Sequence, residues 1–278
     1  MDIFQAFLLG IVEGLTEYLP VSSTGHLLLT QRLLGIESSS SADAFAICIQ
    51  AGAILAVLGL YRARVLQMTQ GLLGRNPEGQ RLALAIVAAF LPAAIIGLAL
   101  EKPIKFYLFG GEAWGLWPIV AAWFVGGIAI LVVSGWRKHS GAIRQTGVDL
   151  NHLTLRMALI IGFAQCIAMW PGVSRSLLTI VGGLLVGLSL PAAVEFSFLL
   201  GVVTLTAATA HDALKHGQEM LATYGAAPLI IGFAAAWLSA VLAIKWMVGY
   251  LKSHGLEIFG WYRVGLAILV AAWLLLGS

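Results

Sequence analysis

Charged side chains are what this sequence has least of. Lysine, arginine, aspartate and glutamate together make up 10% of its 278 residues, whereas about 25% is usual in soluble domains. Hydrophobic residues make up 60%, the mean hydropathy is +0.93, and apolar runs recur at roughly the 20 residues that a bilayer-crossing helix needs. The short alternating segments of a β-barrel are missing. The composition therefore predicts an all-α polytopic membrane protein.

Cysteine is also scarce, and the basic residues are not grouped for nucleic acid. The two cysteines, Cys48 and Cys166, lie in apolar segments, which argues against a disulfide framework. The surplus bases behind the pI of about 9.0 lie in loops, so no nucleic-acid partner is expected. The start, Met1-Asp2-Ile3, lacks the basic residues of a signal peptide. We therefore expect the first apolar segment to be retained.

Six apolar segments are long enough to cross a membrane. They are residues 44–61, 82–100, 114–136, 193–210, 226–246 and 261–277.

Two other apolar regions are interrupted. Residues 3–35 are broken at Pro20 and residues 153–190 at Pro171-Gly172, and proline disrupts a helix by removing an N–H donor and by steric clash. The pieces are mostly too short to span the bilayer, so we predict two re-entrant helix–loop–helix hairpins; two kinked full crossings in each region are the alternative.

The loop charges predict an orientation and an inverted repeat. Loops 62–81 and 137–152 and the connection carrying Lys245 and Lys252 are basic and should be cytoplasmic. The hairpin 3–35 then enters from outside and the hairpin 153–190 from inside. Like elements inserted from opposite faces are typical of inverted repeats.

An offset of 152 residues aligns the two halves. It places Gly10 on Gly162 and Ser22 on Ser174. We therefore divide a single integral membrane domain, 1–278, into repeat 1 (about 1–136) and repeat 2 (about 153–278). Broken helices in such repeats meet near mid-membrane, so the polar clusters at the two breaks should share one cavity.

The first polar cluster contains two carboxylates one helical turn apart, Glu13 and Glu17. Like charges at this spacing repel, unless one is protonated or a cation lies between them. Carboxylate oxygens facing a phosphate suit Mg²⁺ or Ca²⁺. The alternative is a structural pair bonded to backbone or hydroxyl groups.

Three hydroxyls and a histidine follow the break at Pro20. Ser22, Ser23 and Thr24 lie where a second helix should begin, and such a helix start both needs a cap and attracts anions. Ser23 and His26 are three residues apart, so they are neighbours on that helix, as a nucleophile and its base would be. Taken alone, this spacing equally fits a packed histidine.

The second polar cluster adds an arginine. Arg175 has a planar donor fork suited to phosphate oxygens, and Ser174, Ser176 and Thr179 add further donors. An arginine at this depth needs an anion, which could instead be Glu13, Glu17 or Glu195. Gln50 and Glu195 are weaker candidates for the cavity. The two clusters together suit phosphoryl transfer.

Both clusters resemble the signatures of a known family. Residues 13–26, Glu-Gly-Leu-Thr-Glu-Tyr-Leu-Pro-Val-Ser-Ser-Thr-Gly-His, and residues 171–179, Pro-Gly-Val-Ser-Arg-Ser-Leu-Leu-Thr, look like those of the bacterial undecaprenyl-diphosphatases of the bacitracin-resistance type. The resemblance covers essentially the whole chain. It implies an inner-membrane enzyme that recycles the C55 polyprenyl lipid carrier of cell-wall synthesis, with a divalent cation and a site toward the periplasm.

The resemblance also implies roles for individual residues. Glu13 and Glu17 fall in the acidic motif, Ser23 and His26 in the catalytic pair, and Ser174 and Arg175 in the phosphate-binding motif. We expect Ser23 to attack with the help of His26, and His26 as the nucleophile is the variant. Two other functions stay open: a flippase or secondary transporter for a lipid phosphate, and a lipid-binding scaffold. The many glycines suit close helix packing and leave room for a homodimer.

Overall fold

The computed structural model describes residues 1–37, 39–104, 115–139 and 147–276. Within these ranges no β-strand occurs, and the only bridge joins Val148 to Leu188. Short 3₁₀ turns lie at Leu150–His152 and Ile167–Met169. The helices are α1 (Ile3–Thr16), α2 (Ser23–Leu33), α3 (Ser40–Leu60), α4 (Arg62–Leu72), α5 (Pro77–Ile104), α6 (Trp117–His139), α7 (Leu155–Cys166), α8 (Arg175–Leu185), α9 (Leu190–Tyr224), α10 (Ala226–Leu251) and α11 (Glu257–Leu276).

Six of these helices are long and apolar enough to cross a membrane, which confirms the six predicted spans. They are α3, α5, α6, α9, α10 and α11. The predicted starting residue 114 and end residue 277, and part of the predicted loop 137–152, lie outside the described residues. The chain is a multi-pass helical membrane protein.

Much of the predicted loop 62–81 is helical, and so is region 211–225, which follows the predicted span 193–210. The region 211–225 continues α9 to Tyr224, and α4 occupies much of 62–81. Polar residues make region 211–225 unlike a span, but it contains no proline and nothing ends the helix before Gly225. That glycine has a φ of 76°, a conformation that glycine adopts without steric cost.

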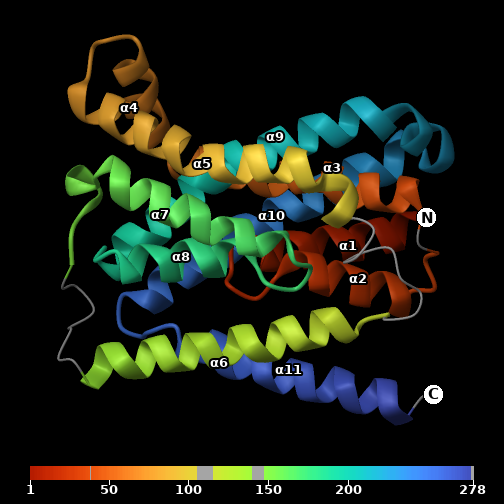
Figure 1. Ribbon diagram of the computed structural model, residues 1–278. Helices are drawn as coiled ribbons and strands as arrows, with labels where there is room; N and C mark the ends of the chain where they lie inside the picture. The colour runs from red at the N-terminus through yellow and green to blue at the C-terminus, as the bar shows by residue number, and fades with distance from the viewer. Residues whose placement is uncertain (38, 105–114, 140–146, 277–278) are drawn as a thin grey trace.

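Each broken region folds back on itself. α1 packs against α2 and α7 against α8, and Figure 1 shows each pair side by side. The Gln5 side chain near the start of α1 donates to the carbonyl of Leu34 beyond the end of α2. Val148 before α7 exchanges backbone hydrogen bonds with Gly187 and Ser189 after α8. Helices of 11 to 14 residues measure about 16–21 Å, less than a ~30 Å hydrocarbon core, which is consistent with re-entrant hairpins.

Glycines bring each hairpin close to a span of the other half. α1 lies on α10 and α7 lies on α5. A Cβ on Gly10 would meet the Gly232 carbonyl at 2.3 Å, and one on Gly162 would meet the Ala89 carbonyl at 2.4 Å. These are the two glycines that the 152-residue offset aligns, so the packing is consistent with the predicted inverted repeat.

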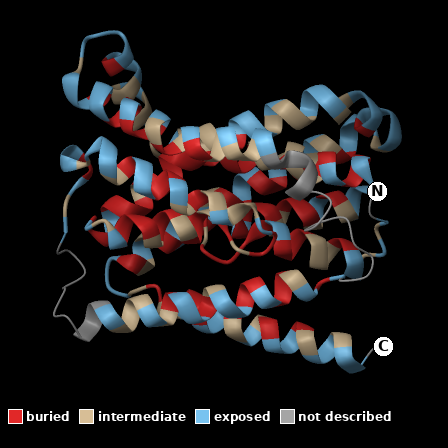
Figure 2. Ribbon diagram, viewed as in Figure 1, coloured by how far each residue is buried: buried red, intermediate tan, exposed pale blue. Residues whose placement is uncertain are grey.

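The α6–α11 pair is set apart from the other helices. Figure 1 shows the pair along one side of the bundle, and among the described helices α11 packs extensively only on α6. Figure 2 shows that buried residues are concentrated in the middle of the bundle. The helices α1, α8 and α10 lie there, between the α6–α11 pair and the opposite side of the molecule. The two breaks therefore lie in the most buried part of the molecule.

Candidate active site

A serine in an unusual backbone conformation directly precedes the second helix of each hairpin. Ser22 has a φ of 76° and Ser174 a φ of 74°, and no other described non-glycine residue has a positive φ. Each hydroxyl caps its helix, since Ser22 accepts from the Gly25 N–H and Ser174 from the Leu177 N–H. Residues held in sparsely populated conformations cluster at functional sites, and helix starts bind anions.

Glu17 joins the two hairpins. Its Oε2 accepts a very short hydrogen bond from the Ser23 hydroxyl and one of 3.3 Å from Gln50. Its Oε1 accepts from Arg175 Nη2 at 2.8 Å. The structure therefore brings together the predicted nucleophile, the arginine predicted to bind phosphate and a carboxylate that accepts the serine's hydrogen bond.

Arg175 is held by contacts on several sides. Nη1 donates to the Ser197 carbonyl at 3.1 Å, and the guanidinium lies 5.3 Å from the centre of the Tyr18 ring. A Cβ on Gly201 would lie 2.3 Å from Nη1, so the guanidinium can take this position because residue 201 is glycine. Nε is buried without a hydrogen-bond partner among the described residues. A fixed guanidinium with an unused donor is suited to an anionic ligand.

The other hydroxyls of the second cluster mainly join segments. Ser176 donates to the Leu19 carbonyl at 2.8 Å and lies 3.0 Å from the Ser174 hydroxyl. Thr179 is fully buried and lies 2.6 Å from the Ser197 hydroxyl. Both were expected to bind phosphate, but in this structure Ser176 ties the two loops together and Thr179 ties α8 to α9.

His26 is directed toward Ser22 and Tyr262, and no hydrogen bond joins it to Ser23, its predicted catalytic partner, among the described residues. Its Nδ1 lies 2.6 Å from the Ser22 carbonyl, which can only accept, so Nδ1 carries a proton. Its Nε2 lies 2.8 Å from the hydroxyl of Tyr262, and the two rings are stacked. The Ser22 carbonyl lies one helical turn before His26. Its contact with Nδ1 holds the His26 ring away from the Ser23 hydroxyl.

Two cavities meet at Ser23. The smaller, about 100 Å³, is lined by the loops of both hairpins: Glu17, Ser22, Ser23, Thr24, Gln50, Ala168, Trp170, Gly172, Ser174, Arg175 and Leu205. The larger, about 470 Å³, shares Ser23, Thr24 and Gln50 with it and adds Glu13. The predicted common cavity is thus present, and His26, Ser176, Thr179 and Glu195 line neither part of it.

Glu13 is the best candidate for holding a cation. It is fully buried, and neither carboxylate oxygen has a hydrogen-bond partner among the described residues. Glu17 lies on the same helical face. No group of three or more potential metal-binding side chains occurs in the described part of the chain. This set fits Mg²⁺, which is often held by one or two carboxylates together with substrate phosphates.

Of the two weaker candidates one lies in the site, and two residues of α11 beside the hairpins were not predicted. Gln50 belongs to the site, whereas Glu195 pairs with Arg64 at 2.7 Å. Tyr262 and Arg263, which contact the hairpins from α11, were not identified from the sequence. An arginine within a predicted span was the available signal, since charge at that depth is costly.

Fold and site together define a class: a polytopic membrane protein with a buried polar site built from two broken-helix hairpins, carrying a serine, a carboxylate and an arginine. The comparison with known families is specific. Residues 6–269 match the family described as bacitracin resistance protein BacA, and the chain belongs to this family.

Several curated proteins are similar over nearly the full length. An undecaprenyl-diphosphatase of Sorangium cellulosum is 48% identical over 271 residues, which cover 96% of this chain and 85% of that protein. The undecaprenyl-diphosphatase 2 of Rhodospirillum rubrum is 41% identical, covering 98% and 95%. An undecaprenyl-diphosphatase of Aquifex aeolicus is 42% identical, covering 99% and 100%.

Proposed function

We propose that this protein hydrolyses undecaprenyl diphosphate to undecaprenyl phosphate and inorganic phosphate. The observation that carries the proposal is the meeting of Ser23, Glu17 and Arg175 at one buried cavity. Membership of the BacA family and the names of the similar proteins support the same substrate. Hydrolysis regenerates the lipid carrier used in cell-wall synthesis, which accounts for resistance to bacitracin.

Ser23 is the proposed nucleophile. Its oxygen bonds to the terminal phosphorus, the bond from that phosphorus to the bridging oxygen breaks, and undecaprenyl phosphate leaves. The serine proton passes to Glu17, which already accepts it in a hydrogen bond. Water then attacks the phosphoserine, which releases phosphate and restores the hydroxyl. Arg175 and the starts of α2 and α8 stabilise the charge on the phosphoryl group.

The geometry supports Ser23 over His26 in this role. Ser23 lines both cavities, whereas both His26 nitrogens are engaged by Ser22 and Tyr262. The predicted assistance by His26 would have to act through the position of α2 rather than through a direct contact with Ser23.

A divalent cation, Mg²⁺ or Ca²⁺, would be held by Glu13 with Glu17. Bound there, it would neutralise charge on the diphosphate oxygens. The two unpartnered oxygens of Glu13 favour this placement, and so does the opening of the larger cavity beside them.

We place the site toward the periplasm of the bacterial inner membrane, with the C55 tail in the bilayer. The larger cavity is lined by residues of α2, by the first half of α3 and by Asp212 and His216 of α9. The orientation predicted from the loop charges places this end of the three helices outside the cell. The predicted homodimer stays a prediction, which the mass of the purified protein tests.

Phosphate release from a polyprenyl diphosphate by the purified protein in detergent tests the function. Release should stop with a chelator and return with Mg²⁺ or Ca²⁺. Glu13→Gln should raise the cation concentration for half-maximal activity at least about tenfold, whereas the exposed Glu78→Gln should not. No release by the wild type, with lipid counterflow in vesicles, would favour a transporter instead.

A further inference from the structure

Arg263 of α11 is completely buried, and its hydrogen-bond partners among the described residues are all backbone carbonyls. Nη2 donates to Ala122 at 2.8 Å and to Gly172 at 2.9 Å. Nη1 donates to Pro20 at 3.3 Å and Nε to Trp123 at 3.4 Å. No ion pair of Arg263 occurs among the described residues. A buried guanidinium without a carboxylate is costly, so these four carbonyls must hold it.

The four acceptors belong to three segments that are far apart in the sequence. Pro20 lies in the loop of the first hairpin, Gly172 in the loop of the second, and Ala122 and Trp123 in α6. Gly126 provides the space, because a Cβ there would lie 2.4 Å from Nη2. One side chain therefore ties both hairpin loops to the α6–α11 pair.

Both loop contacts lie next to the strained serines. Pro20 comes two residues before Ser22, and Gly172 two residues before Ser174, the two described non-glycine residues with positive φ. Such conformations persist only where the surroundings impose them. Trp123 adds a third restraint, since its Nε1 donates to the Val21 carbonyl at 3.1 Å.

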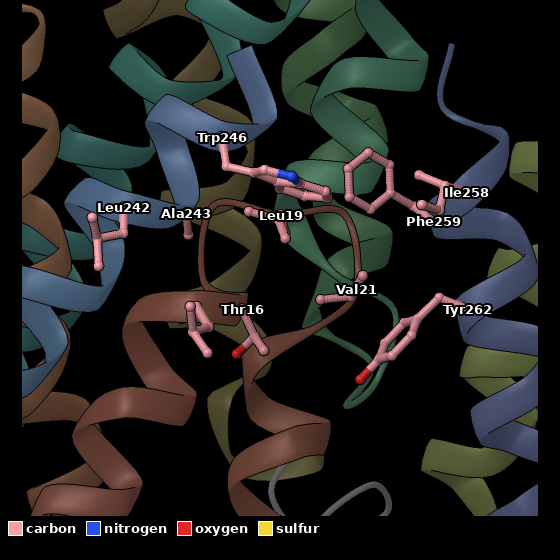
Figure 3. Close-up of a pocket in the computed structure, with 10 residues that line it drawn as sticks. Thr16, Leu19, Val21, Leu242, Ala243, Trp246, Ile258, Phe259 and Tyr262 are labelled. Carbon is pink, nitrogen blue, oxygen red and sulfur yellow. The ribbon is translucent and has the colours of Figure 1, made fainter. Parts of the chain in front are cut away.

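α11 also contacts the first hairpin along α2, where Leu28 and Leu29 belong to the same apolar cluster as Val270 of α11 and Arg32 lies over the Trp273 ring. Figure 3 shows a groove between α10 and α11, with Leu242 and Trp246 on one wall, Ile258 and Tyr262 on the other, and Leu19 and Val21 of the first loop between them. The groove measures about 470 Å³ and its lining is almost entirely apolar. Beside this groove, the polar contacts of Tyr262 and Arg263 connect α11 to the first hairpin, and those of Arg263 also connect it to the loop of the second.

We propose that Arg263 is a positioning residue of the active site. By bonding to Pro20 and Gly172, it holds the two loops in the conformation that places Ser23 and Arg175 on the same phosphoryl group. It does not touch the substrate itself. The inference rests on the proposed phosphatase function. It assigns a role in catalysis to α11, although no residue of α11 lines either of the two cavities that meet at Ser23.

The test uses two pairs of variants in the full-length protein with a polyprenyl diphosphate. Gly126→Ala keeps Arg263 but displaces its guanidinium, while Gly135→Ala on the same helix adds a methyl group with no atom within 4 Å. Arg263→Met removes all four hydrogen bonds, while Arg156→Met makes the same change at an exposed arginine. The measurements are kcat, KM and the thermal unfolding midpoint of each purified protein.

We expect Arg263→Met to lower kcat roughly 100-fold, the effect of a displacement of about 1 Å in an active site. Gly126→Ala should lower kcat at least about threefold by the same route. KM should change less than about threefold in both, and both controls should match the wild type.

If Gly126→Ala keeps wild-type kcat, the inference is wrong, even if Arg263→Met fails to fold. A loss that appears only as a lower unfolding midpoint, with unchanged kcat, would also overturn it, because that outcome is purely structural. An inactive wild type would instead refute the proposed function.

Discussion

Arg175 and Arg64 form ion pairs of similar length in different surroundings. Arg175 lies 2.8 Å from Glu17 and Arg64 lies 2.7 Å from Glu195. The side chains of the first pair are 11% and 5% exposed, and those of the second are 31% and 24% exposed. A partly exposed pair contributes little, whereas a buried guanidinium beside a cavity offers a strong, directional anion site.

Replacing each arginine by lysine separates these roles. Arg175→Lys keeps the charge but cannot bond to Glu17 and Ser197 while also facing a phosphate, so kcat/KM should fall roughly 100-fold or more. Arg64→Lys should stay within about twofold of the wild type. Steady-state phosphate release measures both, and equal activity of the two variants would contradict the assigned role of Arg175.

Sequence reasoning found most residues of the site but not their partners. Glu13, Glu17, Ser23 and Arg175 carry recognisable chemistry in short motifs, and they do line two cavities that share Ser23, Thr24 and Gln50. The His26 ring is held by the nearby Ser22 carbonyl and also by Tyr262, which is 236 residues away. Arg263 likewise depends on backbone carbonyls of distant loops, which no local pattern specifies.

At the scale of helices, the short broken elements depend on glycine contacts. α1 can approach α10 because a Cβ on Gly14 would lie 2.1 Å from the Ser239 hydroxyl and 2.2 Å from the Ala236 carbonyl. This close packing sets the depth of Glu13 and Glu17, which lie on either side of Gly14. The fold of the hairpin and the position of its carboxylates therefore have one cause.

Gly14→Ala should push α1 away from α10. Overpacking of this kind costs about 1–3 kcal/mol, so the thermal unfolding midpoint in detergent should fall. Gly59→Ala is the control, because a Cβ on Gly59 meets no atom within 4 Å. An unchanged midpoint for Gly14→Ala would show that the two helices are less closely packed than described.

The ends of the helices were predicted less well than their existence. Hydropathy located all six spans, but α9 continues through the polar region 211–224 to Gly225. A helix can leave the apolar layer without ending, because its hydrogen bonds are internal, and hydropathy does not report this. The breaks at Pro20 and Pro171-Gly172 were visible because proline acts on the backbone directly.

For the whole molecule, the loop charges predict that α4 and the α4–α5 turn are cytoplasmic and that the turn after α2 is periplasmic. A single cysteine at Arg75 should then react with an impermeant thiol reagent only in inside-out vesicles, and one at Glu37 only in intact cells or spheroplasts. Both positions are exposed, and Cys48 and Cys166 would first be replaced by serine. The reverse pattern would place the site on the cytoplasmic side.

Transfer of the phosphoryl group to Ser23 is the central claim of this account. Rapid quenching of the enzyme with a substrate labelled at its terminal phosphate, followed by peptide mapping, tests it most directly. We predict label on Ser23, and loss of both label and turnover, roughly thousandfold or more, in Ser23→Ala, while Thr30→Ala on the same helix keeps both. Label on His26, or a Ser23→Ala variant with near-wild-type turnover, would contradict it.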